Sequence, residues 1–340
     1  MEDSFFSYNT PDKIVLICIY VVVFFLALLG NTLVLIMICF NKSVRRNVAN
    51  YFLVNLAIAD LLVALVCIPF TVAKHVYTLW VYGEFLCRTI EFMQGIYVEG
   101  SVLTMVCMSA ERYLAIRHPM KMRRICSEKR IKQVIVLTWI LAIISMCPLI
   151  IFIKLDTIDI GGLTISFCSE FWPSSNHRMA YDMFLVIAVY IIPGFFIVML
   201  YTLIGCSLCK PDHYLQRASS CISNEVRVMA SRRKLARMMV IISILFAVCW
   251  MPYFIITTSL NFRLEPQTKA TMLSLYPFAL LLGHSNCAQN PILYCCMHRG
   301  FHDFVTALLK CQCSRHGLKR TVSNAQKVLF VLKMSKILIV

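Results

Sequence analysis

Seven long apolar segments run through the chain, and they limit its fold more than any other feature. They cover residues 14–40, 47–73, 85–116, 131–153, 178–208, 235–260 and 270–297. A helix needs about 20 apolar residues to cross the hydrocarbon core of a bilayer, where lipid offers no partner for an unpaired backbone group. The 340 residues are 59% apolar and 15% charged, unlike a typical soluble protein. We therefore expect an all-α membrane protein, a seven-transmembrane helix bundle.

Lys and Arg are distributed unequally between the two sides of this predicted bundle. Of the 33 basic residues, 26 lie in the first, third and fifth connections, the flanking helix ends and the C-terminal tail, and 7 lie on the opposite side. Basic residues favour the cytoplasmic side, so we expect the N-terminus outside and the C-terminus inside. The net charge of +16 then faces anionic lipid and signalling proteins in the cytoplasm, and nucleic acid is excluded as a partner.

This topology divides the chain into four predicted parts. Residues 1–13 form an extracellular N-terminus, and residues 14–297 form the bundle. Residues 298–313 form a membrane-surface helix with a cysteine anchor, and residues 314–340 form a cytoplasmic tail.

Two of the 17 cysteines, Cys87 and Cys168, lie in oxidising space outside the lipid. We expect a disulfide between them; the alternative is two free thiols. The loop that carries Cys168 has two short β-prone runs around Gly161 and Gly162, which favours a β-hairpin in the second extracellular loop. A hairpin tied to the third segment would keep an open mouth above the bundle, which suits a peptide ligand better than a buried lipid.

Polar, aromatic or helix-breaking residues recur inside each segment, where a polar residue is costly and therefore a candidate for function. In order they are Gly30-Asn31, Leu56-Ala-Ile-Ala-Asp60, Glu111-Arg112-Tyr113, Trp139, Pro193 with Tyr201, Phe246-Ala-Val-Cys-Trp250-Met-Pro252, and Asn286-Cys-Ala-Gln-Asn290-Pro291-Ile-Leu-Tyr294. In this order and at this spacing they resemble the rhodopsin-like (class A) G-protein-coupled receptors. The resemblance covers all seven segments.

The resemblance implies a polar cluster inside the bundle that can hold a sodium ion. The residues implied as its ligands are Asp60, Ser101, Asn286 and Asn290, with Asn31 beside them. Cys287 stands where the family more often has serine, and this weakens one ligand. The alternative is a water-filled polar network without sodium.

The resemblance also implies a set of residues that switch the bundle between two states. They are Glu111, Arg112, Tyr113, Tyr201, Phe246, Trp250, Pro252, Asn290, Pro291 and Tyr294. In this family Glu111 would hold Arg112 until the C-terminal helix of a G protein arrives. The start of the sixth segment, residues 232–234, is basic rather than acidic. Because no second acid can hold Arg112 from there, we expect some basal activity.

Residues 298–309 place apolar side chains at helical spacing, and Cys311 and Cys313 follow. This pattern predicts an amphipathic helix on the inner leaflet, anchored by acyl chains on these cysteines. The alternative is two unmodified thiols. The apolar stretch 327–340 is too short to span, and predicts either a membrane-surface strip or a C-terminal ligand for a PDZ-type domain.

The residues near the outer mouth favour a peptide ligand. Gln94 stands where amine receptors of the family have aspartate, and His284 stands where opsins have lysine. A neutral glutamine is frequent among neuropeptide receptors, and the chain resembles the orexin, neuropeptide FF and cholecystokinin groups. The predicted ligand-binding residues are Gln94, Glu91, Glu99, Val98, Phe70, Glu170, Asp182, Tyr253, Phe254 and His284.

An acidic mouth with aromatic walls favours a cationic peptide. The alternative is that the acids only balance Lys74, Arg88 and Arg178. Glu99 either receives an arginine of the ligand or hydrogen-bonds a carbonyl.

Together these features predict a plasma-membrane receptor without a catalytic centre or a cofactor other than the structural sodium ion. Its partners would be a peptide, a heterotrimeric G protein, arrestin and membrane lipid. The alternatives are a class A receptor for a lipid or an amine, and a transporter, although the internal repeats of transporters are not found.

Overall fold

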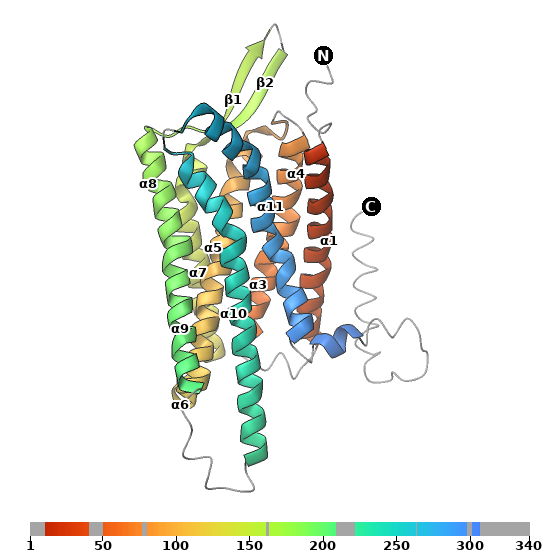
Figure 1. Cartoon of the computed structure of the whole chain (residues 1–340), viewed down its shortest axis with the longest axis vertical. Coiled ribbons are helices and arrows are strands. Elements are labelled where there is room, and N and C mark those ends of the chain that lie inside the picture. The colour runs from red at the N-terminus through yellow and green to blue at the C-terminus, as the bar shows by residue number, and fades with distance from the viewer. Residues whose placement is uncertain are drawn as a thin grey trace, which may run out of the picture.

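The computed structural model describes residues 11–40, 50–76, 80–160, 163–208, 222–262, 264–297 and 301–306. Within these residues seven helical rods stand side by side, with a strand pair at one end (Figure 1). The rods are α1 (Pro11–Phe40), α3–η2–α4 (Asn50–Leu62, Val63–Cys67, Ile68–Val76), α5 (Gly83–Arg117), α7 (Glu128–Phe152), α8–η3–α9 (Ser175–Leu185, Val186–Ile191, Ile192–Leu208), α10 (Ile222–Ser259) and α11 (Pro266–Met297). A short helix, α6 (Pro119–Ile125), follows α5.

The rods differ in their content of polar residues. Five are long and apolar enough to cross a membrane: Pro11–Cys39, Asn50–Lys74, Glu128–Phe152, Ser175–Cys206 and Ala236–Ser259. The remaining two, α5 and α11, have 35 and 32 residues and are therefore also long enough, but they carry more polar residues. α5 contacts α3, α7, α9, α10 and β1, so most of its polar side chains face protein rather than lipid.

Two rods contain a π-helical turn, and each turn comes just before a proline. Val63–Cys67 precedes Pro69, and Val186–Ile191 precedes Pro193. Proline lacks an N–H donor, and its ring collides with the carbonyl four residues earlier. The wider turn moves that carbonyl aside without breaking the helix.

Except at the start of α10, the helix ends differ from the predicted segments by a few residues. α1 begins at Pro11, three residues before the predicted start, because proline suits the first turn and Asp12 complements the helix dipole. α7 begins at Glu128, since the Ser127 hydroxyl accepts a hydrogen bond from the Arg130 N–H. α10 begins at Ile222, well before the predicted residue 235. The prediction followed apolar residues only, whereas the helix also includes the polar and basic residues that precede them.

β1 (Ile153–Ile160) and β2 (Leu163–Glu170) form an antiparallel pair. Ile153 pairs with Glu170 at the base, and Leu155 pairs with Cys168. The pair projects beyond the end of the bundle at which α4 ends and α8 and α11 begin (Figure 1). β2 therefore returns the chain to the first turns of α5.

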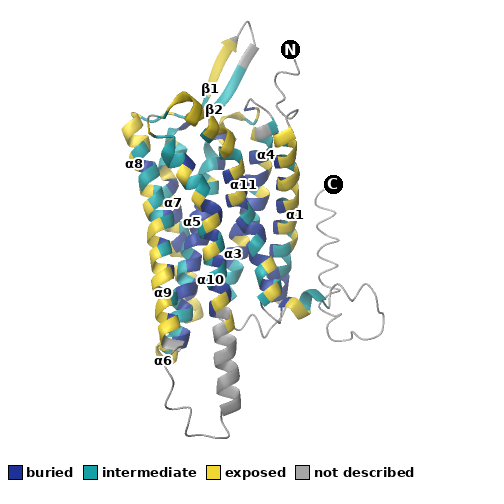
Figure 2. Cartoon of the chain, viewed as in Figure 1, coloured by how far each residue is buried: buried dark blue, intermediate teal, exposed yellow. Residues whose placement is uncertain are grey.

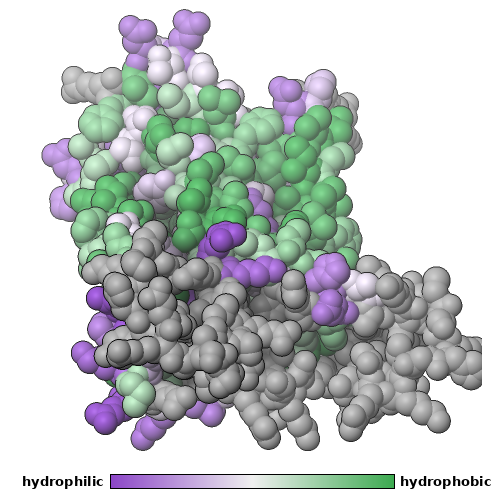
Figure 3. All heavy atoms as spheres, turned by 60° about the horizontal axis from the view of Figure 1, so that its bottom comes forward, coloured by the Kyte–Doolittle hydropathy of each residue, from purple (hydrophilic) through white to green (hydrophobic). Residues whose placement is uncertain are grey.

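Burial divides the bundle into an interior and an outer apolar belt. Buried residues line the centre and exposed ones face outward (Figure 2). Many of the exposed residues are large and apolar, such as Val22, Ile144 and Phe195. On the face drawn in Figure 3, hydrophobic residues cover the side of the bundle, and hydrophilic residues lie above and below them. An apolar belt between two polar ends is the surface of a protein that spans a membrane.

Candidate functional site

A cavity of about 490 Å³ opens at the end of the bundle that carries the strand pair. Side chains from α4, α5, α7, β2, α8, α10 and α11 line it. Eight of the ten predicted ligand-binding residues are among them: Phe70, Glu91, Gln94, Val98, Glu170, Asp182, Tyr253 and Phe254. Residues that are more than a hundred positions apart in the sequence thus share one cavity.

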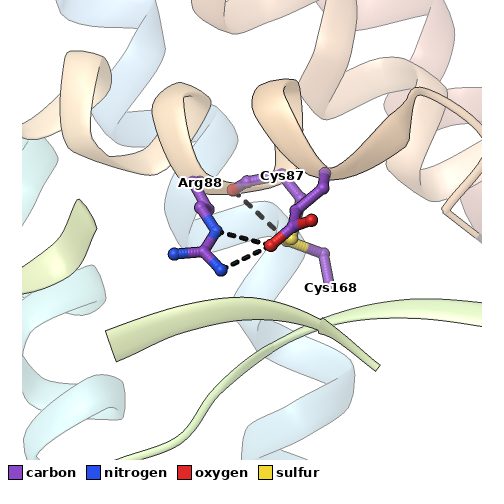
Figure 4. Close-up of polar contacts among 4 residues, drawn as sticks. Cys87, Arg88 and Cys168 are labelled. Atoms are coloured by element: carbon purple, nitrogen blue, oxygen red, sulfur yellow. Dashed lines mark hydrogen bonds and ion pairs between the residues drawn. A yellow bond between two sulfur atoms is a disulfide. The ribbon is translucent and has the colours of Figure 1, made fainter. Parts of the chain in front are cut away.

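A disulfide between Cys87 and Cys168 holds β2 over this cavity, as the sequence predicts. It joins the first turns of α5 to the middle of β2 (Figure 4). The Trp80 N–H donates to the Ser166 carbonyl at 2.8 Å, and the Trp80 indole donates to the Gly83 carbonyl at 2.7 Å. Gly83 has a φ of 77°, which glycine adopts without strain. These links fix one rim of the cavity.

Most acids at the mouth are paired with a basic side chain. Lys74 Nζ lies 2.9 Å from Glu91 Oε1, and Arg178 Nε lies 3.5 Å from Glu170 Oε2. Arg88 pairs with Glu84 on the outer surface of α5. Lys74, Arg88 and Arg178 are the basic residues expected if the acids of the mouth only balance neighbouring charges. A cationic ligand at Glu91 or Glu170 would therefore have to compete with a residue of the protein.

Glu170 and Asp182 also accept neutral hydrogen bonds. The Trp172 indole donates to Glu170 Oε2 at 2.7 Å. Burial raises the pKa of the Glu170 carboxyl, and this bond and Arg178 oppose the rise. The Asn261 amide donates to Asp182 Oδ2 at 2.7 Å and so connects α8 to the end of α10. The described lining residues include three carboxylates and two cations, a net charge of −1.

Aromatic rings form the wall of the cavity on the side of α10 and α11. The Tyr253 ring lies 5.5 Å from Trp250, 5.7 Å from Phe254 and 5.7 Å from Tyr276. Trp250 lies deepest and contacts Phe246 at 6.2 Å. These contacts connect the wall of the cavity to the middle of α10.

Two predicted ligand-binding residues, Glu99 and His284, lie beside the cavity rather than in its described lining. Glu99 faces α7, where the Ser145 hydroxyl donates to its Oε1 at 3.1 Å. His284 lies behind Trp250, with the ring centroids 6.2 Å apart, and its Nδ1 is 3.4 Å from the Tyr20 hydroxyl of α1. Both side chains therefore contact other residues of the protein, and neither is part of the described cavity lining.

A second polar cluster lies deeper, around Asp60. The Asn290 amide donates to Asp60 Oδ2 at 2.8 Å, and the Asn31 amide donates to the carbonyls of Ala27 and Cys287. The side-chain oxygens of Asn31 and Asn290 are buried without a hydrogen-bond partner among the described residues. Buried carboxylate and amide oxygens are ligands for hard cations, so this set fits the sodium ion that the family resemblance implies.

The remaining two predicted sodium ligands differ in what they contact. The Ser101 hydroxyl donates to the carbonyl of Tyr97 in its own helix. The Asn286 amide nitrogen is buried without a partner among the described residues. Neither is shown in contact with Asp60.

The predicted switch residues extend from Trp250 in the outer cavity to the inner end of the bundle. Arg112 Nε is 2.8 Å from Glu111 Oε2 at the end of α5. The Ser109 and Tyr201 hydroxyls are 3.2 Å apart and join α5 to α9. The Tyr294 ring contacts Phe301 at 6.5 Å, while Pro252 and Pro291 lie inside α10 and α11. Tyr113 packs with Ile116, Ile204 and Ala236.

Sequence reasoning missed Gly283, a glycine that contacts the central tryptophan. A Cβ built on Gly283 would lie 2.9 Å from the Trp250 ring, too close for a real side chain. In the same way, a Cβ on Gly30 would lie 2.6 Å from Pro291. Gly283 lies one residue before the predicted ligand-binding residue His284, and a glycine inside a helix was the only signal available.

The predicted lipidation sites, Cys311 and Cys313, lie outside the described residues. Residues 301–306 are helical, and Phe301 is buried against the bundle.

Comparison with known proteins shows similarity over nearly the whole chain. The family described as 7 transmembrane receptor (rhodopsin family) matches residues 30–294. The chain is 31% identical over 317 residues to a QRFP-like peptide receptor of Branchiostoma floridae, covering 92% of this chain and 82% of that protein. It is 27% identical over 319 residues to neuropeptide FF receptor 1 of Rattus norvegicus, covering 91% and 73%. It is also 27% identical over 337 residues to a cholecystokinin receptor of Xenopus laevis, covering 84% and 74%.

Proposed function

Since the chain belongs to the rhodopsin family of seven-transmembrane receptors, we propose that it binds an extracellular neuropeptide and activates a heterotrimeric G protein. The relatives that cover most of its length are named as receptors for peptides. Its role is reception rather than catalysis. The observation that carries the proposal is the cavity itself, which opens beside β2 and extends down to Trp250.

The size of the cavity indicates how much of a peptide it holds. A volume of about 490 Å³ is within the range of roughly 300–1,000 Å³ for small-molecule sites, and is too small for a whole peptide. We therefore expect one end of the peptide to enter, while the remainder lies across β2 and the rim. The disulfide keeps that rim in place whether or not a ligand is bound.

A cationic peptide end fits the chemistry of the cavity. Asp182 is the strongest candidate for its partner, because it accepts a hydrogen bond from a neutral amide, whereas Glu91 and Glu170 each form an ion pair. Arg178 also acts on Asp182 electrostatically, but its ion pair is with Glu170. The aromatic wall of Tyr253 and Phe254 would stack on an aromatic residue or a guanidinium group. Binding at Asp182 would also weaken its hydrogen bond to Asn261 and so change the contact between α8 and α10.

Ligand binding would bias the bundle between two arrangements. A ligand shifts such an equilibrium only by binding one state more tightly than the other. Trp250 contacts both the cavity wall and Phe246. A shift of Trp250 on ligand binding would therefore move Phe246 and change the packing of the middle of α10. At the inner end, Arg112 would leave Glu111 and meet the G protein. The Asp60 cluster would change its hydrogen bonds in the same transition.

Asp60, Asn31 and Asn290 would hold a sodium ion, with Ser101 and Asn286 completing the site. The ion would supply positive charge beside a buried carboxylate. With or without a bound sodium ion, the Asn290 amide orients the Asp60 carboxylate.

The orientation and the other partners belong to the same proposal. The protein is a multi-pass membrane protein, and we place it in the plasma membrane with β1 and β2 as the hairpin of the second extracellular loop. Its basic residues then face the cytoplasm, where arrestin and anionic lipid would bind. Residues 298–313 would form the membrane-surface helix, anchored by acylated Cys311 and Cys313.

The test is nucleotide exchange on purified G proteins, stimulated by a panel of amidated cationic and neutral peptides. We expect one or more cationic peptides to act, and Asp182→Asn to lower their potency at least about tenfold, as for a lost charge-assisted contact. Glu84→Gln is the matched control, since Glu84 pairs with Arg88 on the outer surface of α5. A response to an amine or a lipid, with none to any peptide, would contradict the ligand class and leave the family unchanged.

A further inference from the structure

Trp172 lies beside the outer cavity and is not among the predicted ligand-binding residues. It belongs to residues 171–174, which join β2 to α8. It is half-buried and is not part of the described cavity lining. Its indole N–H nevertheless donates to Oε2 of Glu170, a residue that does line the cavity, at 2.7 Å. Trp172 therefore acts on a ligand through Glu170.

Two neighbouring rings hold the Trp172 indole in place. Its centroid lies 4.3 Å from that of Phe152 at the end of α7 and 5.1 Å from that of Tyr181 of α8. The Phe171 N–H donates to the Phe152 carbonyl at 2.8 Å, which also fixes the backbone before Trp172 to α7. The Tyr181 hydroxyl donates to the Ser145 carbonyl at 3.1 Å. Because packing restricts the indole, its N–H points in one preferred direction.

The two carboxylate oxygens of Glu170 have unequal contacts. Oε2 accepts from the Trp172 indole and lies 3.5 Å from Arg178 Nε. Among the described residues, no hydrogen bond or ion pair is found at Oε1. Each oxygen of a carboxylate accepts hydrogen bonds, and the Glu170 side chain is 24% exposed. Oε1 therefore remains able to accept from a bound molecule.

The indole orients this carboxylate more firmly than the ion pair does. The Arg178 side chain is 47% exposed and its contact with Glu170 is 3.5 Å long. Exposed ion pairs of this kind contribute little, because water and salt screen them. The indole bond is shorter, its acceptor is an ionised oxygen and its donor is held by packing. Trp172 therefore determines which oxygen of Glu170 stays with the protein.

We propose that Trp172 is a positioning residue for ligand binding: its indole holds Oε2 of Glu170, so that Oε1 accepts a hydrogen bond from a neutral N–H of the peptide. A neutral donor, such as a backbone amide, leaves Arg178 in place, whereas a second cation would compete with it. Asp182 then receives the cationic group of the same peptide. The proposal rests on the function proposed above, because the donor belongs to the peptide.

The same hydrogen bond connects Trp172 to the charge of Glu170. Burial raises the pKa of the Glu170 carboxyl, while the indole bond and Arg178 lower it. Because an N–H donor stabilises the ionised form, its removal raises the pKa further, and the carboxyl then protonates at a higher pH. The other charged and titratable groups that interact electrostatically with Glu170 are Lys74 of α4, Glu91 of α5, Tyr181 and Asp182 of α8, Tyr253 of α10 and Tyr276 of α11.

The test uses Trp172→Phe in the full-length receptor in lipid vesicles, with the most potent peptide of the exchange assay as the probe. Phenylalanine keeps a ring against Phe152 and Tyr181 and removes the donor. We expect affinity at neutral pH to fall at least about threefold, as for one lost hydrogen bond, and the loss of affinity in acid to begin at higher pH. Phe184→Leu is the matched control and should match the wild type, because Phe184 also packs on Tyr181, at 6.3 Å, and has no described contact with Glu170.

Glu170→Gln decides whether Trp172 acts through Glu170. In that background, Trp172→Phe should change neither the affinity nor its dependence on pH, because the two residues belong to one interaction. An equal loss of affinity in both backgrounds would overturn the proposal and make Trp172 a packing residue only. No loss in either background would overturn it as well.

A measurement without peptide separates this proposal from the proposed function. Infrared spectra across pH contain the carbonyl stretch of each protonated carboxyl, and the part that is missing in Glu170→Gln belongs to Glu170. We expect this band to appear at higher pH in Trp172→Phe than in the wild type and Phe184→Leu. The same pH in all three would overturn the role of Trp172. A shifted band in a receptor that no peptide activates would keep Trp172 as the residue that orients Glu170 and would contradict the peptide ligand.

Discussion

The outer cavity and the inner Asp60 cluster hold their charges in different ways. In the outer cavity, Glu91 and Glu170 each lie near a basic side chain, and water has access to them. In the inner cluster, Asp60 is 3% exposed and its described partner is the neutral amide of Asn290. Exposed ion pairs exchange partners at little cost, whereas a buried carboxylate depends on each hydrogen bond. The outer region is thus suited to binding a ligand, and the inner region to changing state.

The largest expected effect comes from removing the disulfide, which acts on the outer region alone. In Cys87→Ser/Cys168→Ser, β2 loses its link to α5, a constraint worth roughly 2–5 kcal/mol in typical proteins. We expect peptide affinity to fall at least about 100-fold and the basal rate of nucleotide exchange to change less than about twofold. Radioligand binding and nucleotide exchange on the same vesicles measure the two. Loss of both would show that the outer rim also holds the inner bundle together.

A second effect should be confined to the inner region. In Asn290→Ala, Asp60 loses the amide that donates to it, so the balance between the two states changes. We expect the maximal response to agonist to fall about tenfold, with peptide affinity within about threefold of the wild type. Ser274→Ala is the control on α11, because Ser274 is exposed and bonds only within its own turn. An affinity loss as large as the loss of response would contradict the separation of the two regions.

Gly283→Ala should affect the contact between the two regions. Its Cβ would lie 2.9 Å from the Trp250 ring, and a buried indole has little room to move. We expect a loss of roughly 1–3 kcal/mol in stability, as for an overpacked core, together with a changed basal rate of exchange. Thermal unfolding in detergent measures the stability. Gly205→Ala has open space around it and should match the wild type; equal values for both variants would show that Trp250 moves freely.

The smallest effect is a pH dependence of binding at the outer cavity. Burial raises the pKa of Glu170 above that of an ordinary carboxyl. Protonation of Glu170 removes a negative charge from the cavity, so the affinity for a cationic ligand should fall severalfold as pH drops from neutral toward the raised pKa of Glu170. In Glu170→Gln this dependence should be weaker, which peptide binding at several pH values would measure. An unchanged profile in Glu170→Gln would assign the titration to another group.

Much of the fold could be predicted from the sequence, because membrane helices follow local rules. Apolar length sets each span, and the helix ends moved by only a few residues except at α10, where the helix continues past its apolar segment. The Cys87–Cys168 pair could also be predicted, since the predicted topology left these two cysteines alone in oxidising space outside the lipid.

Predictions for the site were less complete where they depended on side-chain direction. The sequence places Glu99 one turn or so beyond Gln94, but the rotation of α5 turns Glu99 toward Ser145 of α7. The role of Gly283 depends on a tryptophan of another helix, and no local pattern contains that contact.

The sequence by itself determined that this chain spans a membrane seven times and belongs with peptide receptors, because lipid imposes apolar length and the family motifs lie within single helices. Only the tertiary structure decided that Asp182 is the acid of the mouth that accepts a hydrogen bond from a neutral amide. It also decided that an apolar cavity lies between α9 and α10. Both results depend on how helices pack against one another. Distances between side chains of different helices are set by that packing and not by spacing along the chain.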